Sequence, residues 1–591
     1  MRFPNVIRLL KPYRTHLIVG PSFKLTEAVL ELLVPILIAF IVDKGIVEKN
    51  TQVIWQYGLL AFVLACAGLL CALICQYTAS RASQGYGTDL RNLLADRIMR
   101  LSVDDAQQIG SSSLANRLIT DTMTLQQAVA MLIRLVVRAP FLSVGALVMA
   151  LLIDWRLASV FVLVIPLFIV VLYFIMSRSV PLHRKTLQQQ DDMSAIMQEN
   201  LQGMRIIRAY NRQELRAARF NSASSRLRDL AEQAGRLSGW LNPLTMLLLN
   251  IAVAAVLLLG GWRIDHGRLS QGQLIALINY LTQILQALIV VANLVMLYAR
   301  AWNSAGRTEE ILGMTVAASE VEGDFTTSEN TTENSQQNSV AFAGVDFSYP
   351  RSTGGFIEQL SFKLEPGSVN GLIGPAGSGK STIARLLVRL YEPVLGRIML
   401  GDRAVDEFSA AELSSLIGYV PQNPSLMTGT IEENLRMGRD AFSEDDLWHA
   451  LRLAQADGFV RELNDGLNSQ VTRGGRNFSG GQRQRLAIAR AILGRPRVII
   501  LDDSTSALDY ATDLALRRAL MLDEFLKSST WIIISQRIAN IRDADNILLL
   551  DDGALLASGT HEELMSGSDM YRELFHSQLD TRQHEEEADN D

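Results

Sequence analysis

The stretch VIILDDSTSALD, from Val498 to Asp509, decides the fold class of the C-terminal half of this 591-residue chain. Four apolar residues lead directly into two consecutive aspartates. A short apolar run bounded by such residues predicts a buried strand. Two carboxylates at its end suit a hard cation, which prefers oxygen ligands. The stretch therefore predicts one half of a metal-dependent site, at the edge of a sheet.

The other half of that site lies in GLIGPAGSGKST, from Gly371 to Thr382. It contains the pattern G-x-x-x-x-G-K-[ST] between an apolar strand and a helix-forming segment, which predicts a nucleotide-binding loop. Backbone N–H groups of such a loop surround the phosphates, while Lys380 neutralises their charge and Ser381 supplies a magnesium ligand. The residues predicted to contact ATP here are Gly374, Gly377, Gly379, Lys380, Ser381 and Thr382.

Asp502 is predicted to complete this site beside Mg²⁺, in the role of the acid that closes a Walker B strand. Asp503 follows at the position where such enzymes place a carboxylate to orient the attacking water. The cofactors expected from these residues are ATP and Mg²⁺.

Composition places the N-terminal half in a membrane. The chain is 49% hydrophobic and 20% charged, and its net charge of −6 gives no sign of nucleic-acid binding. A membrane span needs about 20 mostly apolar residues. Six segments in the first three hundred residues are candidates, centred on Ala28–Val42, Leu59–Ile74, Leu142–Ile153, Ala158–Met176, Leu244–Gly261 and Leu274–Ala299. Three cysteines, Cys66, Cys71 and Cys75, fall in the second segment and are expected only to pack.

Short and long connections alternate between these spans, and the long ones are rich in arginine. Because positively charged connections stay in the cytoplasm, we expect a multi-pass protein of the cytoplasmic (inner) membrane with both termini and the nucleotide-binding domain inside the cell. The expected domains are a six-helix membrane domain at 1–312, a flexible polar linker at 313–339, an α/β P-loop domain at 340–575 and an acidic disordered tail at 576–591.

The segment FSGGQRQRLAIARA, from Phe478 to Ala491, resembles the signature of ATP-binding cassette (ABC) transporters. With six preceding spans, the resemblance covers nearly the whole chain and is strongest to bacterial half-size exporters. It implies that Tyr349 stacks on adenine and that Gln422 contacts magnesium and couples to the membrane domain. It also implies that Ser506–Asp509 crosses to a partner cassette, and that a short transverse helix within Glu199–Glu214 presses on a cassette. In such dimers the signature residues Ser479, Gly480, Gly481 and Gln482 complete the ATP site of the partner.

Two residues depart from the active pattern of the family. Asp503 stands where the family has glutamate, and Gln536, in IISQRIANI, stands where it has a switch histidine. Aspartate is one methylene shorter, and a misplacement on the order of 1 Å can lower a rate ~100-fold. Glutamine cannot shuttle a proton as histidine can. Both changes predict slow hydrolysis with retained ATP binding. Arg473, just before the signature, replaces an acid common in the family and has no clear consequence.

These features predict one subunit of a heterodimeric exporter whose own site is degenerate. The partner would be a second half-transporter with glutamate and histidine in its ATP site, and the substrate a small amphiphilic, drug-like or lipid-like molecule. Two alternatives stay open at this point: a homodimeric exporter that hydrolyses ATP slowly, and a nucleotide-regulated lipid scramblase or channel subunit.

Charged and polar residues inside the spans are candidates for the transport path. Lys24, Glu27 and Glu31 share one face of the first span, with Arg134 and Arg138 as candidate partners. We expect structural ion pairs in preference to a contact with a cationic substrate. A polar stripe on the last span lines a wet cavity or forms helix–helix hydrogen bonds; it consists of Asn279, Thr282, Gln283, Gln286 and Asn293.

Overall fold

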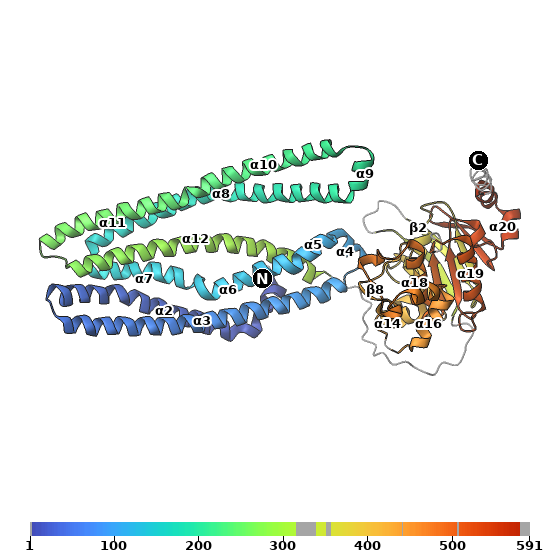
Figure 1. Cartoon of the computed structure of the whole chain (residues 1–591), viewed down its shortest axis with the longest axis horizontal. Helices are drawn as coiled ribbons and strands as arrows, with labels where there is room; N and C mark the ends of the chain where they lie inside the picture. Colours follow the sequence, from blue (N-terminus) through green and yellow to red (C-terminus); the bar gives the residue numbers. More distant parts are fainter. Residues whose placement is uncertain (1–2, 315–337, 350–355, 440, 505–507, 579–591) are drawn as a thin grey trace. The chain divides into compact units, whose positions relative to one another are not determined.

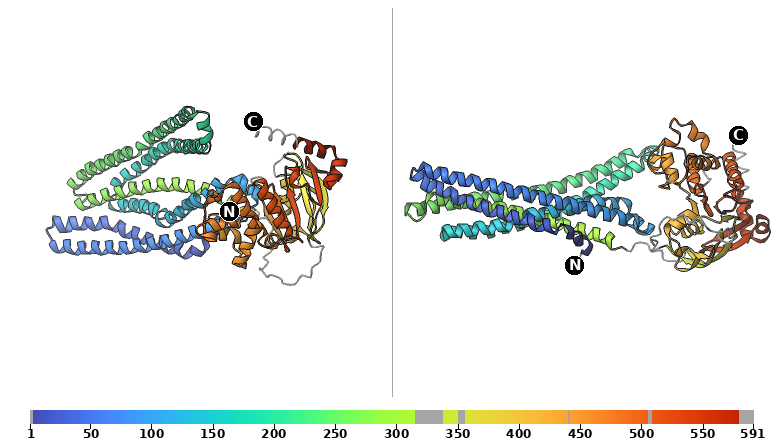
Figure 2. Two further views of the ribbon diagram at one scale, coloured as in Figure 1. Left: turned by 45° about the vertical axis from the view of Figure 1, so that its right-hand side comes forward. Right: turned by 90° about the horizontal axis from the view of Figure 1, so that it is seen from below.

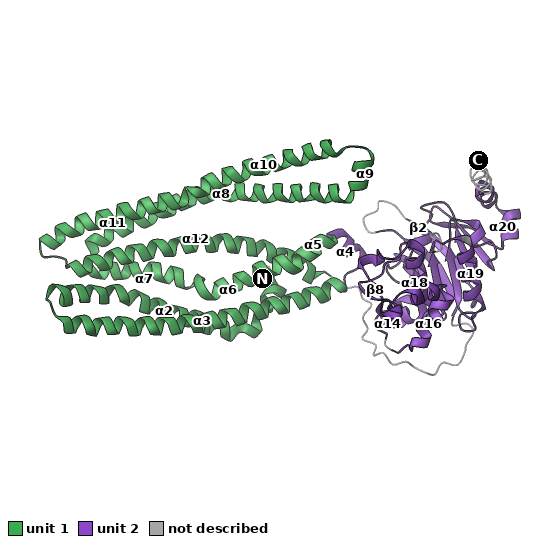
Figure 3. Cartoon of the chain, viewed as in Figure 1, with its two compact units in different colours: residues 1–99, 110–314 green, residues 100–109, 315–591 purple. Residues whose placement is uncertain are grey.

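The computed structural model describes residues 3–314, 338–349, 356–439, 441–504 and 508–578. The chain forms two compact units (Figure 3): residues 1–99 with 110–314, and residues 100–109 with 315–591. Most of the predicted linker and the end of the predicted acidic tail lie outside the described residues, so both stay predictions.

The first unit is entirely helical in its described part. Its elements are α1 (Pro4–Arg8), η1 (Lys11–Tyr13), α2 (Arg14–Phe40), η2 (Ile41–Val47), α3 (Thr51–Met99), α5 (Ser111–Asn116), η3 (Arg117–Asp121), α6 (Thr122–Met131), η4 (Leu132–Val136), α7 (Arg138–Ile153), α8 (Trp155–Gln202), α9 (Met204–Ala209), α10 (Gln213–Gly239), α11 (Leu241–Asp265) and α12 (Gln271–Gly313). The segments η2, η3 and η4 are π-helical. They lie within the first and third candidate spans.

Six of these helical segments are long and apolar enough to cross a membrane, which confirms the predicted number of spans. They are Pro4–Val47, Thr51–Met99, Ser111–Ile153, Trp155–Gln202, Gln213–Asp265 and Gln271–Gly313. Each has at least 43 residues, about twice the length that a bilayer requires. The excess length forms the long helical extensions predicted between the spans.

Two of the three short connections are fixed by acidic caps. Asp154 accepts hydrogen bonds from the backbone N–H groups of Arg156 (2.9 Å) and Leu157 (3.1 Å) at the start of α8, and it forms an ion pair with Arg263 at 2.5 Å. Asp43 accepts a hydrogen bond from Gly272 N at 2.8 Å at the start of α12. These carboxylates satisfy backbone donors that helix starts leave unpaired, so they set where the chain reverses, at the left end of Figure 1.

The hairpin of α8 and α10–α11 diverges from the other helices toward α9 (Figures 1 and 2). The short helix α9 (Met204–Ala209) lies inside the stretch predicted to form a transverse helix, which confirms that a short helix forms there. The hydrophobic core of the unit forms where α2, α7, α8, α11 and α12 pack together, around Phe161, Phe168 and Tyr280.

The second unit has an α/β core. A six-stranded sheet has the order β12-β11-β3-β10-β9-β6, and a four-stranded antiparallel sheet has the order β2-β1-β4-β5. The strands are β1 (Val340–Phe347), β2 (Ile357–Leu364), β3 (Val369–Ile373), β4 (Leu395–Leu400), β5 (Arg403–Ala404), β6 (Ile417–Val420), β7 (Gly429–Thr430), β8 (Gln470–Val471), β9 (Val498–Asp502), β10 (Thr530–Ile534), β11 (Asn546–Asp551) and β12 (Ala554–Gly559). Every residue of β9 is buried, which confirms the strand predicted from its apolar run.

In its described part, the second unit also contains twelve helical segments after β3. They are α13 (Lys380–Leu387), α14 (Ala410–Leu416), α15 (Ile431–Arg436), α16 (Glu444–Leu453), α17 (Asp457–Glu462), α18 (Gly480–Ile492), α19 (Tyr510–Leu522) and α20 (His561–Gly567), with short helices η6 (Val405–Glu407), η7 (Gly466–Asn468), η8 (Arg473–Gly475) and η9 (Ile538–Asn540). The unit also includes α4 (Val103–Ile109), which comes from the N-terminal half of the sequence (Figure 3).

Candidate nucleotide-binding site

The carboxyl ends of four neighbouring parallel strands bring the predicted site residues to one edge of the sheet. In β9, Asp502 is level with Ile534 of β10, and Ile534 is level with Leu372 of β3. On the other side of β9, β6 ends one residue earlier, with Val420 opposite Leu501. The segments that follow these strands therefore emerge side by side, and crevices at this edge are where open α/β sheets bind ligands.

The phosphate-binding loop follows β3. Its glycines Gly374, Gly377 and Gly379 have φ angles of 155°, 90° and 97°, a region that side chains rarely occupy. At Gly374 a Cβ atom would lie 2.0 Å from the carbonyl oxygen of Leu550, so a side chain has no room there. The loop ends at Lys380, the first residue of α13, so the N-terminus of that helix faces the loop and favours an anion. This geometry fits the phosphates of a nucleotide.

Lys380 occupies the interior of this loop. Its Nζ donates hydrogen bonds to the carbonyl oxygens of Gly374 (2.8 Å) and Pro375 (2.6 Å) and to Oγ of Ser378 (3.0 Å). Burial lowers the pKa of Lys380, while the charges of Asp502 and Asp503 act in the opposite direction. The ammonium group is thus held by neutral oxygens, and a phosphate would offer it a full counter-charge.

Ser381 and Asp502 form the predicted metal corner. Ser381 Oγ donates a hydrogen bond to Asp502 Oδ1 at 2.9 Å, although the two residues are 121 positions apart in the chain. Burial raises the pKa of Asp502, and the Ser381 hydrogen bond partly opposes that shift. A hydroxyl and a carboxylate oxygen in contact are ligands that Mg²⁺ prefers. The residues present therefore fit that ion.

Asp503 and Gln422 are also brought together. Gln422 Nε2 donates a hydrogen bond to Asp503 Oδ2 at 3.2 Å. Asp503 has a φ of 46°, and its backbone N–H donates to Ile534 O at 2.9 Å, so the left-handed turn is tied to the end of β10. Gln536 lies two residues beyond β10 and its side chain is exposed at the same edge. All three predicted catalytic residues thus belong to this edge of the sheet.

Tyr349 is held in a small aromatic cluster. Its ring makes edge contacts with Phe347, Phe356 and Tyr391, and its hydroxyl lies 2.9 Å from Thr382 Oγ1. Its role as an adenine contact stays a prediction.

Two residues beside this site were not predicted from the sequence. Arg385, in α13, donates a hydrogen bond from Nη1 to Tyr349 at 3.3 Å. Tyr419 lies in β6, which pairs with the strand β9 that ends at Asp502, and burial raises the Tyr419 pKa to about 12. Neither position belongs to a motif. Arg385 reaches the aromatic ring from α13, and Tyr419 comes beside the carboxylate because β6 pairs with β9.

The signature residues begin α18. Ser479 is exposed and caps the helix: Gln482 N donates to Ser479 Oγ (3.2 Å), and Ser479 N donates to Gln482 Oε1 (2.9 Å). Gly480 and Gly481 form the first turn and are followed by buried Leu486. Part of the predicted crossing loop, residues 505–507, lies outside the described residues. Arg473 is exposed in η8, and nothing in the structure explains its substitution.

The predicted ion pairs in the spans are present. Lys24 Nζ lies 2.7 Å from Glu27, and Arg138 Nη2 lies 2.7 Å from Glu31. Both carboxylates are therefore ion-paired as predicted, and their structural role stays a prediction.

The polar stripe of α12 gives a mixed result. Asn279 and Thr282 each donate to a backbone carbonyl of their own helix, and not to another helix. Oε1 of Gln283 is buried without a hydrogen-bond partner in the described part of the chain. Gln286 and Asn293 are exposed. For Asn279 and Thr282, these contacts favour the lining of a water-filled cavity over hydrogen bonding between helices.

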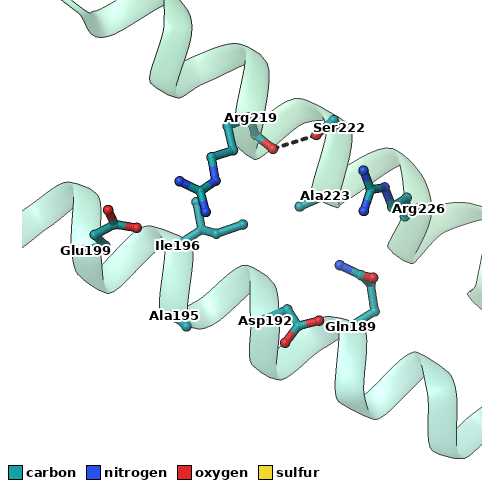
Figure 4. Close-up of a pocket in the computed structure, with 9 residues that line it drawn as sticks. All are labelled: Gln189, Asp192, Ala195, Ile196, Glu199, Arg219, Ser222, Ala223 and Arg226. Carbon is teal, nitrogen blue, oxygen red and sulfur yellow. Dashed lines mark hydrogen bonds between the residues drawn. The ribbon is translucent and has the colours of Figure 1, made fainter.

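A surface pocket of about 420 Å³ lies in the first unit, between α8 and α10 (Figure 4). Arg219 and Arg226 on α10 face Asp192 and Glu199 on α8 across it, so its charges balance. Its mixed charges suit a solvated helical hairpin.

Comparison with known proteins agrees with this site and fold. The family description "ABC transporter transmembrane region" matches residues 17–288, and "ABC transporter" matches residues 357–506. An uncharacterised ABC transporter ATP-binding protein of Bacillus subtilis is 34% identical over 575 residues, covering 97% of this chain and 98% of the relative. A "multidrug resistance ABC transporter ATP-binding and permease protein" of Lactococcus lactis is 29% identical over 584 residues, covering 98% and 95%.

The chain belongs to the ABC transporter family. It is a half-size transporter of the exporter type, with one six-helix membrane domain fused to one ATP-binding cassette. The same fold is seen in the structure of a bacterial Atm1-family ABC exporter with ATP bound, which superimposes with a TM-score of 0.78 over 97% of this chain and 99% of that chain at 23% identity. It follows that this multi-pass membrane protein binds ATP, acts as an ATPase-coupled transporter and works as a dimer in the lipid bilayer.

Proposed function

We propose that this chain is the degenerate-site subunit of a heterodimeric exporter of the cytoplasmic membrane, and that it moves small amphiphilic, drug-like or lipid-like molecules outward. One observation carries the proposal: Asp503 and Gln536 stand together at the sheet edge where the active family pattern has glutamate and histidine. One such change could be neutral. Two changes in a single site favour a loss of hydrolysis.

ATP binding uses the residues already in place. The N–H groups from Gly377 to Thr382 surround the phosphates, and Lys380 exchanges its carbonyl contacts for the β- and γ-phosphates. Ser381, Asp502 and Gln422 provide oxygen ligands for Mg²⁺, which neutralises phosphate charge when bound. None of these binding groups is altered, so this site retains ATP.

The two residues expected to act in hydrolysis, Asp503 and Gln536, differ from the active pattern of the family. The Asp503 carboxylate is one methylene shorter than glutamate, and it already accepts a hydrogen bond from Gln422. A water positioned by this carboxylate would be displaced from its line of attack, and ~1 Å costs a rate about 100-fold. Gln536 is able to hydrogen-bond to a γ-phosphate but supplies no titratable group. Slow turnover at this site follows from both.

The partner subunit would supply the active site. Ser479 and Gly481 lie at an exposed helix start with intact signature chemistry, and a helix N-terminus favours a phosphate. In the proposed dimer they complete an ATP site whose glutamate and histidine belong to the partner. The name of the multidrug-resistance relative supports an amphiphilic substrate. The arginine-rich long connections support cytoplasmic termini.

Purification of the chain alone and with its partner tests the proposal. We expect ATP binding but slow ATP hydrolysis for the chain alone, and fast hydrolysis for the pair. In the pair, Ser479→Arg should suppress turnover more than Asp503→Asn does, because it places bulk and charge in the active site of the partner. Fast hydrolysis by the chain alone would identify a homodimeric exporter. A lack of vanadate-sensitive uphill accumulation in vesicles would argue against pumping.

A further inference from the structure

Five ionisable side chains occur where the first and third spans pack together. Lys24, Glu27 and Glu31 belong to α2, Arg134 lies in η4, and Arg138 begins α7. The helices are in close contact here: a Cβ atom on Gly20 of α2 would lie 2.4 Å from the side chain of Ile133. Cys75 of α3 is buried nearby, with its Sγ 4.0 Å from the carbonyl oxygen of Ile133. The charges therefore share one region of the packed spans.

The pairing in this cluster is incomplete. The two carboxylates are taken by Lys24 and Arg138, each at 2.7 Å. Within the described residues, Arg134 has no carboxylate within 4.0 Å and no hydrogen bond, and its Nε is buried without a partner. Three cations and two carboxylates leave one net positive charge, and that charge belongs to Arg134.

Only one of the two arginines in this cluster is paired. Arg134 lies in the π-helical segment η4 (Leu132–Val136), and Arg138, four residues later, begins α7. Arg138 reaches Glu31. Single-turn π segments of this kind occur frequently at functional sites.

The position of Arg134 suits the head of an amphiphile. It precedes the turn at Asp154 by 20 residues, or about 30 Å of helix at 1.5 Å per residue, close to the thickness of the hydrocarbon layer. The guanidinium thus lies near one boundary of that layer, with exposed Leu132 and Val137 on the neighbouring turns. An unpaired charge at such a site is costly unless a ligand or water compensates it.

We infer that Arg134 binds the anionic head group of the transported amphiphile, whose tail lies along the apolar surface beside it. This inference specifies the substrate class of the proposed exporter, and it rests on the proposal that the protein transports amphiphiles outward. A guanidinium offers paired N–H donors in a planar fork, which match a phosphate or carboxylate and cannot lose their charge near neutral pH. The substrate class is therefore amphiphiles with a net negative head group.

The test uses the full-length transporter in nanodiscs without nucleotide. Binding of lysophosphatidylglycerol, which has one net negative charge, is compared with binding of lysophosphatidylcholine of the same acyl chain, which has none. Free glycerol phosphate, which has the anionic head group but no acyl chain, is the third ligand tested. We expect saturable binding of the anionic lipid, at least about tenfold weaker binding in Arg134→Ala, and partial recovery in Arg134→Lys. Lysophosphatidylcholine should bind weakly and equally to all three proteins.

Glu31→Gln is a matched variant that should change lipid binding in the opposite direction from Arg134→Ala. It frees Arg138 and raises the net charge of the cluster, so it should strengthen binding of the anionic lipid, which a purely structural role for the cluster would not do. Equal lipid binding by the wild type and Arg134→Ala would overturn the inference, as would tight binding of glycerol phosphate alone, which requires no amphiphile. ATP binding by the cassette checks that each variant is folded.

The outcome is separable from that of the proposed function. Lipid binding without nucleotide does not depend on which cassette hydrolyses ATP. Symmetric hydrolysis would refute the degenerate site and leave Arg134 untouched, whereas charge-independent lipid binding would refute the head-group site and leave the asymmetry of the cassettes intact.

Discussion

At the residue scale, the two acids at the end of β9 perform different tasks because their surroundings differ. Asp502 is buried and accepts a hydrogen bond from Ser381, whereas Asp503 is only half-buried and accepts one from Gln422. The first geometry is that of a metal ligand. The second is that of a group that orients a small polar molecule. The length of the Asp503 side chain therefore affects chemistry more than binding.

The double variant Asp503→Glu with Gln536→His should raise hydrolysis at this site. The two groups act on one γ-phosphate and one water, so the gain should exceed the product of the two single gains. ATPase activity is measured in a dimer whose partner lacks its catalytic glutamate, so that only this site reports. If the double variant stays inactive while the signature of the partner is intact, these two residues do not limit hydrolysis.

Asp502 should link magnesium binding to pH. Burial raises the pKa of Asp502, so the folded, ligand-free protein binds this proton more tightly than the unfolded chain does. The resulting stabilisation is fully present at low pH. It is lost as pH rises from the ordinary aspartate range through the raised pKa. Magnesium requires the carboxylate, so Mg-ATP binding should release a proton in that window and weaken below it. Titration calorimetry in two buffers of different ionisation enthalpy measures this release.

Asp502→Asn is the control for this linkage. It should abolish the proton release and lower the affinity for Mg-ATP by about 10- to 100-fold, while leaving ATP binding without magnesium nearly intact. Proton release that persists unchanged in Asp502→Asn would show that another group titrates.

At the element scale, the start of α18 combines a structural and a functional role in Ser479. Ser479→Ala removes the helix cap and should lower the free energy of unfolding by about 1 kcal/mol. Ser479→Asp keeps a good cap but places a negative charge where the phosphates of the partner's ATP would lie. We therefore expect the aspartate variant to be as stable as the wild type, by thermal unfolding, yet much less active in the dimer. If both variants are equally active, the signature does not contact ATP.

Some elements are predictable from sequence because their cause is local. The apolar run of β9, the glycines of the phosphate loop and the six apolar spans each follow from short patterns. The positions of Arg385 and Tyr419 were not predicted because they depend on how α13 and β6 each lie beside β9. The choice of Glu31 between Arg134 and Arg138 could not be predicted either, because it depends on how α2 packs against η4 and α7.

At the scale of the whole molecule, two units with different chemistry must act as one transporter, and each ATP site of the proposed dimer draws on both chains. The phosphate loop and metal ligands of this chain belong to one site, and its exposed signature belongs to the other. A substitution in either place therefore reports on a different site. This separation allows the proposed asymmetry to be measured.

Lys380→Ala is the variant that measures it. The change removes the cation that the phosphate loop holds through Gly374, Pro375 and Ser378, so this site should lose retained ATP. Hydrolysis at the site of the partner uses the signature of this chain and not its lysine, so substantial ATPase activity should remain. The matched variant replaces the corresponding lysine of the partner, and there turnover should fall to near background. Nucleotide occupancy after rapid desalting and steady-state ATPase activity are measured on both dimers. Because the two variants remove the same group from the two sites, any difference between them reflects the asymmetry itself, and equal loss of turnover in both would mean that the two sites hydrolyse ATP in concert.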